Sequence, residues 1–258
     1  MIRNLSGRGW LASLAVLALA MLMAGAAPAQ ATVPDTIQNV RFGDHTTFER
    51  AVIDLGHGGV PGQVAPTFSS SYRQGDWIVR VDLLSVTATA RTDGSGLGRA
   101  ISKYYVVRSR SSTGNMFVDF HLTGAAKSVN VFKLDNPARI VVDVTPGGTT
   151  LFPRPVTGAS TVVTRPRTDM LVGPDTFIVS GYGRPFEASG VWRIKNASGT
   201  VVRRGTYTTS DWAATWGAYK FSAGYPSSLS GHSGTLQVGE LSPKDGSFMG
   251  VSVPLRFR

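Results

Sequence analysis

Glycine and proline recur at short intervals along this chain, and no long helical period follows residue 31. The 258 residues include 30 glycines and 14 prolines. These residues end strands and form turns, whereas a helix needs a sustained apolar pattern with a period of about 3.6 residues. Runs such as Val79 to Leu83 instead alternate between apolar and polar side chains, as half-buried strands do. The sequence therefore predicts an all-β protein with many short strands.

The first 31 residues have the pattern of a secretory signal peptide. Arg3 and Arg8 form a positive start, Leu11 to Met23 is apolar, and Ala29-Gln30-Ala31 is a small-x-small cleavage pattern. A membrane-spanning helix needs about twenty apolar residues, and this run is shorter. We therefore expect cleavage after about Ala31, a secreted, extracytoplasmic location at the cell envelope, and no transmembrane anchor in the mature chain.

The composition of the expected mature chain sets limits on its chemistry. Its 227 residues fit one large or two ordinary domains, and they allow a full core without cross-links. Cysteine is absent, which excludes disulfides, thiolate metal sites and a lipid-modified cysteine.

The mature chain is basic, with 24 lysines and arginines, 16 acidic residues and a net charge of about +8. This charge fits general solubility, and it also fits affinity for a polyanion such as a wall polymer or an anionic membrane surface. Nucleic acid is not an expected partner, because export takes the protein away from it. The positive residues are scattered, and the nearest approach to clusters is in three pairs: Arg108 with Arg110, Arg165 with Arg167, and Arg203 with Arg204.

A segment rich in proline, glycine and threonine, 147–163, predicts a linker between two β-sandwich domains at 37–146 and 164–258. In the first domain, strands are predicted at 48–55, 77–90, 103–110, 116–122, 128–134 and 139–144. In the second domain, they are predicted at 175–181, 187–196, 201–207, 216–221, 234–241 and 249–257. The number and spacing of the second set favour an immunoglobulin-like sandwich.

Two motifs at the ends of the first domain carry a family resemblance. The opening Val40 to Leu55 (VRFGDHTTFERAVIDL) and the ending Leu134 to Val144 (LDNPARIVVDV) resemble the start and the close of the AMIN-like domain of exported bacterial proteins. The middle of the domain matches only as alternating strands. AMIN domains proper are β-sandwiches that direct periplasmic amidases and secretins to the cell wall. For this chain, the resemblance implies an envelope-facing module.

The second domain carries a spaced set of glycines, aromatic residues and acids. Its members are Val179-Ser180-Gly181, Phe186-Glu187-Ala188, Trp192, Gly205, Trp216, Tyr219, Phe221, Gly234, Glu240 and Lys244-Asp245-Gly246. This set resembles the Gmad2 domain, the immunoglobulin-like module named from bacterial spore-germination proteins. The resemblance implies no enzymatic activity and a place beside another envelope domain. The stretch Ser210 to Thr215 departs from the family pattern and predicts an enlarged loop.

The residues predict no catalytic site, no metal site and no cofactor. Four histidines are present, and the best pair, Asp44-His45, fits either a ligand or general base or a hydrogen bond that orients a loop. Gly94 to Gly98 lacks the helix and lysine of a phosphate-binding loop, and no Gly-x-Ser-x-Gly elbow occurs. Glu187 and Glu240 lie on different strands and could form an acid pair. The pattern favours a structural role for Glu187, as an acceptor of backbone N–H groups at a strand corner.

Aromatic residues are the best candidates for binding. Trp192 and Trp216 are expected in the core, since large aromatic side chains dominate sandwich interiors. Trp212 lies in the enlarged loop, where it could stack on a sugar, anchor an interface or fold back over the sandwich edge. A second candidate patch lies in the first domain: Tyr104, Tyr105 and Arg108.

We therefore expect a non-catalytic exported protein that binds a wall polymer or another exported protein at the cell envelope. One alternative is a cell-wall hydrolase with a site between the two domains, using Glu187 or Asp44 with His45. Another alternative is a structural partner module in a spore or surface complex. The sequence indicates no oligomeric state.

Overall fold

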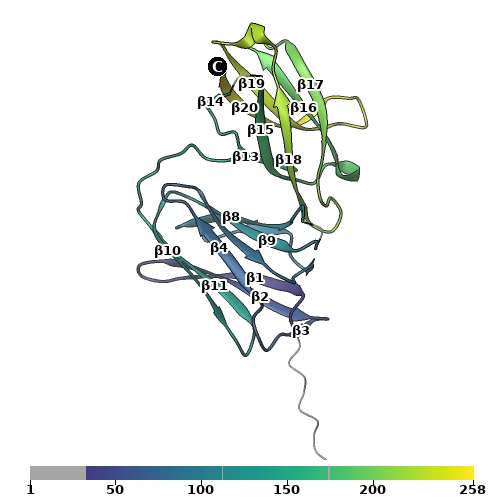
Figure 1. The fold of residues 1–258 in the computed structure, drawn as a ribbon. Coiled ribbons are helices and arrows are strands. Elements are labelled where there is room, and N and C mark those ends of the chain that lie inside the picture. The colour runs from purple at the N-terminus through teal and green to yellow at the C-terminus, as the bar shows by residue number, and fades with distance from the viewer. Residues whose placement is uncertain (1–32, 112, 174) are drawn as a thin grey trace, which may run out of the picture. The chain divides into compact units, whose positions relative to one another are not determined.

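The computed structural model describes residues 33–111, 113–173 and 175–258. The predicted signal peptide lies outside the described residues. The predicted all-β fold is confirmed, with strands β1 to β20 and two short 3₁₀ turns, η1 (Phe186–Ala188) and η2 (Ser227–Leu229) (Figure 1). Within the described ranges, no helix has the length and apolar character needed to cross a membrane. Both sandwiches belong to one compact unit, Thr32–Arg258.

The first sandwich has an outer sheet with the strand order β10-β11-β2-β1-β6, in which β3 also pairs with β2. Because alternate residues of a strand share a face, β2 directs Ala51, Ile53 and Leu55 into the core of this sandwich. The strands of this sheet are β1 (Thr36–Asp44), β2 (Glu49–His57), β3 (Val60–Pro61), β6 (Ala88–Thr89), β10 (Ala126–Leu134) and β11 (Arg139–Pro146).

A second sheet contributes to both sandwiches. Its order is β12-β13-β15-β18-β8-β9-β5-β4, with β7 paired to β8. The parallel pairing of β18 with β8 makes the sheet continuous, with Trp216 opposite Val107 and Gly217 opposite Arg108. Its strands are β4 (Phe68–Tyr72), β5 (Ile78–Leu83), β7 (Asp93–Ser95), β8 (Ile101–Arg108), β9 (Met116–Leu122), β12 (Val156–Thr157), β13 (Thr161–Arg165), β15 (Thr176–Gly183) and β18 (Trp216–Gly224).

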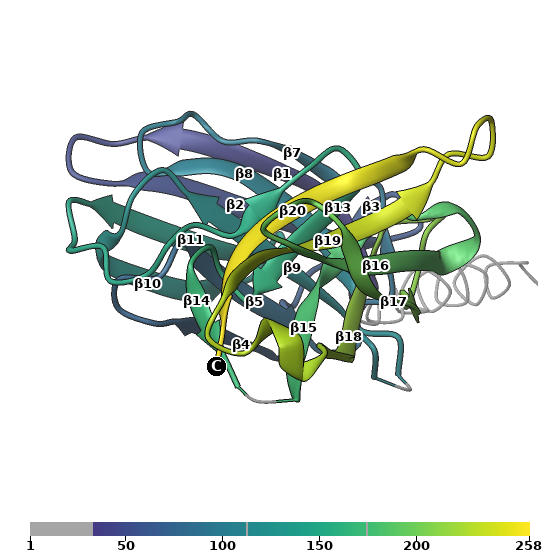
Figure 2. The ribbon, with the colours of Figure 1, turned by 90° about the horizontal axis from the view of Figure 1, so that it is seen from above.

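The third sheet closes the second sandwich in the order β14-β20-β19-β16-β17. Strands β19 and β20 pair along their length and form a long hairpin (Figure 2). The core between this sheet and β15 and β18 contains Trp192, Tyr219 and Phe257, so the predicted burial of Trp192 is confirmed. The strands are β14 (Met170–Val172), β16 (Ser189–Asn196), β17 (Val201–Thr208), β19 (Ser233–Leu241) and β20 (Phe248–Phe257).

For two segments, 77–90 and 147–163, the structure adds detail that the sequence pattern does not show. The strand predicted over 77–90 ends at Leu83, and the chain turns at Ser85, whose φ is 69°. The segment 147–163 contains β12 and the first residues of β13. It also contacts the first sandwich, because the guanidinium of Arg154 lies 4.2 Å from the ring centre of Trp77. The segment 147–163 has the composition of a linker, but strand pairing and the contact of Arg154 with Trp77 hold much of it in place.

A buried cluster, here called the inter-sandwich cluster, joins residues of both sandwiches. Strand β8 lies between this cluster and the first core, so its Tyr104 faces one core and Tyr105 faces the other. The members of the inter-sandwich cluster are Tyr105, Val107, Phe117, Val162, Tyr182 and Trp216.

Candidate functional site

The loop that precedes β18 is organised by the carboxylate of Asp211. Its Oδ1 accepts hydrogen bonds from the backbone N–H groups of Trp212, Ala213 and Ala214, at 2.7, 3.1 and 3.2 Å. Its Oδ2 accepts one from Nε of Arg108, at 2.8 Å. Partial burial raises the pKa of Asp211, but the hydrogen bonds from Arg108 and from the backbone outweigh burial, so that this pKa lies below its usual value. The predicted loop over Ser210 to Thr215 is confirmed, and the hydrogen bonds of Asp211 hold its backbone.

Trp212 presents its ring to solvent beside a second aromatic side chain. Its side chain is 39% exposed, and that of Phe186 is 64% exposed. The two rings meet edge to face with their centres 5.4 Å apart. Arg184 donates to the carbonyl oxygens of Trp212 and Ala213, at 3.4 and 3.3 Å. We call Phe186 and Trp212 the exposed aromatic pair.

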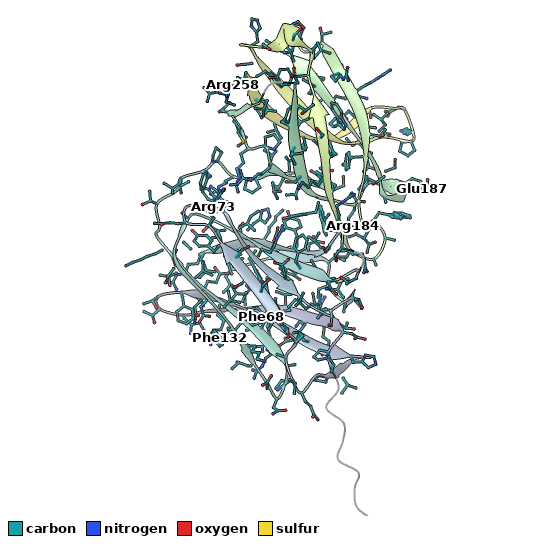
Figure 3. The ribbon with its side chains drawn as sticks, viewed as in Figure 1. Phe68, Arg73, Phe132, Arg184, Glu187 and Arg258 are labelled. Atoms are coloured by element: carbon teal, nitrogen blue, oxygen red, sulfur yellow. The ribbon has the colours of Figure 1, made fainter. Side chains whose placement is uncertain are left out.

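The corner that carries Phe186 is held by Glu240 on β19. Its Oε2 accepts the backbone N–H of Phe186 at 2.9 Å, and its Oε1 accepts the hydroxyl of Ser160 at 3.3 Å. Glu187 is exposed and has φ 53°, in the left-handed region, and Figure 3 shows it on the outside of the sandwich. The structural role predicted for Glu187 therefore belongs to Glu240.

The structure corrects the second predicted patch. Tyr104 and Tyr105 are only 5% and 3% exposed, because β8 is covered on both faces. The ring centre of Tyr105 lies 4.8 Å from that of Trp216. Arg108 donates to Asp211 and to the carbonyl oxygens of Thr87 and Gly114. The two tyrosines are therefore core residues, and the partly exposed Arg108 is engaged in holding neighbouring loops.

The residues considered for catalysis have structural partners. Asp44 forms an ion pair with Arg99, and the ring of His45 stacks on Phe48 with centres 4.4 Å apart. These contacts favour the loop-orienting role for Asp44-His45. In the part of the chain that the structure describes, no group of three or more histidine, aspartate or glutamate side chains is placed to hold a metal ion.

The glycine-rich segment Gly94 to Gly98 leads into a turn that surrounds a carboxylate. Glu49 is fully buried, and it accepts the backbone N–H groups of Leu97, Ala100 and Ile101 at 2.9, 2.7 and 3.1 Å. The N–H groups of this turn are thus taken up by a negative charge of the protein itself. They do not form a cradle for a phosphate.

His121 is buried next to the inter-sandwich cluster. Its Nε2 forms a hydrogen bond with the hydroxyl of Tyr182. Burial lowers the pKa of His121 to about 4 and raises that of Tyr182 well above its usual value. Both groups are therefore neutral near pH 7, and their contact joins β9 of the first sandwich to β15 of the second.

A cleft of about 270 Å³ lies beside the same junction and is lined by arginines. Sequence reasoning missed it, except that Arg165 and Arg167 were recognised as a close pair. The other two arginines, Arg73 and Arg80, come from the first sandwich. The pairing of β18 with β8 and the ion pair of Arg167 with Asp76 bring these four residues together.

Comparison with known proteins supports the reading of the second sandwich. Residues 160–247 match the Gmad2 family, described as the immunoglobulin-like domain of bacterial spore germination. The match includes both members of the exposed aromatic pair, whereas residues 37–146 lie outside it, so the AMIN-like resemblance stays a prediction. No curated protein matches the chain, and no solved structure does. The second sandwich is therefore similar to the Gmad2 immunoglobulin-like domain over residues 160–247.

Proposed function

We propose that this protein is a non-catalytic, exported component of the cell envelope that binds a wall polymer through the exposed aromatic pair. The observation that carries the proposal is the solvent exposure of Phe186 and Trp212 on a rigid support. Backbone hydrogen bonds to Glu240 and Asp211 fix both segments. An aromatic ring offers a flat apolar surface to one face of a sugar, and a surface that is fixed beforehand loses less entropy on binding.

The neighbours of the pair favour a sugar over a protein partner. Glu187 follows Phe186 in the chain, and its exposed carboxylate supplies acceptors for hydroxyl groups. Two rings offer little area compared with the roughly 800 Å² that each partner buries in an ordinary protein interface. The predicted signal peptide and the AMIN-like resemblance support an envelope location.

The purified mature chain, residues 32–258, tests this proposal by co-sedimentation with purified peptidoglycan sacculi at low salt. We expect binding by the wild type and a loss of about tenfold or more for Trp212→Ala and for Phe186→Ala, which corresponds to about 1.4 kcal/mol. Ile178→Ala is the matched control, because Ile178 is a 52% exposed apolar residue on β15 of the same sandwich. Wild-type levels of binding by folded Trp212→Ala would contradict the proposal.

The family match favours a second candidate, a structural partner module in a spore or surface complex. It predicts that cross-linking in intact cells yields one dominant protein adduct, which Trp212→Ala weakens. A single adduct together with no binding to sacculi would favour this candidate over glycan binding. The hydrolase alternative would use Glu187, which is exposed, or Asp44 with His45, of which Asp44 forms an ion pair with Arg99. Muropeptide release by the wild type, lost on mutation of these residues, would favour it.

A further inference from the structure

The arginine-lined cleft combines positive charge with hydroxyl groups. Arg73 follows β4, where Figure 3 labels it, and Arg80 lies on β5. Arg165 ends β13, and Arg167 follows two residues later. The hydroxyl groups along the cleft belong to Ser71, Thr164 and Ser180.

The carboxylates near the cleft neutralise only part of its charge. Asp76 accepts from Arg73 at 3.1 Å and from Arg167, so it holds these two guanidinium groups close together. Arg80 makes two hydrogen bonds to the fully buried Asp119, at 2.7 and 2.8 Å. Asp82 also lies close enough to Arg80 to raise the pKa of that arginine, so four arginines against three aspartates leave a formal net charge of +1 around the cleft.

Two of the arginines have unused capacity to donate. The side chain of Arg167 is 6% exposed, and its Nε is buried without a hydrogen-bond partner among the described residues. A buried donor without a partner is destabilising. Arg165 has no ion pair within the described ranges, and burial together with the charges of Arg73 and Arg167 lowers its pKa. Such repulsion is relieved when an anion enters.

We infer that this cleft is a binding site for the oxyanion of a phosphate group. The guanidinium fork of Arg165 matches the oxygen geometry of phosphate, and the hydroxyl groups of Ser71 and Ser180 add neutral donors. The excess of positive charge attracts a phosphate monoester, which carries about −1.5 to −2 near pH 7. The site uses residues of both sandwiches and does not depend on the exposed aromatic pair.

The direct test is a titration of the mature chain with inorganic phosphate at constant ionic strength. Arginine Nε–H resonances and the melting temperature report binding, and acetate and chloride serve as comparison anions. We expect phosphate to shift the resonances of Arg165 and Arg167 and to raise the melting temperature more than acetate does. Equal effects of phosphate and acetate would overturn the inference.

Variants separate the cleft from general charge. Arg165→Gln should weaken phosphate binding about tenfold, because it removes the positive charge and the guanidinium fork that donates to phosphate oxygens. Arg165→Lys keeps the charge but loses the fork, so it should bind with intermediate affinity. Arg204→Gln removes the same charge from an exposed site on β17 and should bind like the wild type. Equal weakening in Arg165→Gln and Arg204→Gln would contradict the assignment.

Vesicles distinguish two sources of the phosphate group. If the wild type binds phosphatidylglycerol vesicles but not phosphatidylcholine vesicles, and Arg165→Gln does not bind either, the group belongs to a lipid head. Binding of inorganic phosphate without binding to vesicles assigns the site to a soluble or polymer-borne phosphate. Both results support phosphate recognition, and the absence of any phosphate effect on wild-type protein refutes it.

Discussion

Trp212 and Trp216 stand four residues apart and have opposite surroundings. Trp216 is 3% exposed, donates from Nε1 to Asp93 at 3.2 Å, and packs on Tyr105 and Tyr182. Trp212 is 39% exposed and packs on Phe186, which is itself exposed. One tryptophan joins two sandwiches, and the other is left at the surface.

The contrast shows that residue type alone does not separate packing from binding. Trp216 opens β18, and the pairing of this strand with β8 places it inside the continuous sheet. Trp212 lies one residue after Asp211, whose carboxylate holds its backbone in the preceding loop. Substitutions in the two regions show whether the surroundings of Trp212 and of Trp216 contribute differently to the free energy of unfolding, as their exposure indicates.

The largest expected effect is the loss of stability in Trp216→Ala. Truncating a large buried aromatic side chain costs about 3 to 5 kcal/mol, and this change also removes one of the hydrogen bonds to Asp93. Trp212→Ala should lower the free energy of unfolding by clearly less, because Trp212 is 39% exposed and packs on Phe186, which is itself exposed. Chemical denaturation measures both values. Equal losses of unfolding free energy in the two variants would show that the two tryptophans contribute equally to stability.

The second effect is a fall in stability on acidification, caused by His121 beside the inter-sandwich cluster. Its folded pKa of about 4 lies below the ordinary value of 6.5. As the pH falls from 7 through 6.5 toward 4, the unfolded chain therefore binds a proton that the folded chain does not. A difference of about 2.5 pKa units corresponds to a loss of about 3 kcal/mol over this window.

His121→Gln tests that assignment, because glutamine does not titrate. We expect its unfolding free energy, measured by denaturation at several pH values, to vary less between pH 7 and pH 4 than that of the wild type. Its stability at pH 7 serves as the reference for any packing cost of the substitution. The same slope in both proteins would show that other groups cause the pH dependence.

The third effect concerns Asp211, which links the loop of Trp212 to Arg108 on β8. Asp211→Ala should cost about 2 kcal/mol, because it removes an acceptor from three N–H groups and leaves Arg108 without its ion pair. It should also weaken binding to sacculi by releasing the loop of Trp212. Asp211→Asn keeps one carbonyl oxygen for the loop and should retain more binding. If Asp211→Ala binds like the wild type, the loop does not need this support.

Much of the fold could be predicted because alternation and turn residues are local signals. The strand predicted over 116–122 coincides with β9, and the burial of Trp192 and Trp216 followed from residue size. The burial of Tyr105 did not, since its partner Trp216 lies more than a hundred positions away. A signal was present, because Tyr104 to Val107 is a continuous apolar run, which is typical of strands buried on both faces.

The candidate sites were less predictable for the same reason. Trp212 was found because a tryptophan in an enlarged loop is unusual locally. The arginine-lined cleft has no local pattern, since Arg73 and Arg80 lie far in the sequence from Arg165 and Arg167 and meet them through tertiary pairing, including that of β8 with β18. The choice between Glu187 and Glu240 at the corner also depended on backbone conformation, which residue type does not specify.

Binding of a wall polymer through the exposed aromatic pair is tested most directly by a binding isotherm for purified sacculi with the wild type and Trp212→Ala. Both proteins are first shown to melt within a few degrees of each other, so that folding is equal. We expect saturable binding by the wild type and binding about tenfold or more weaker by Trp212→Ala. Identical isotherms for the two folded proteins would contradict it.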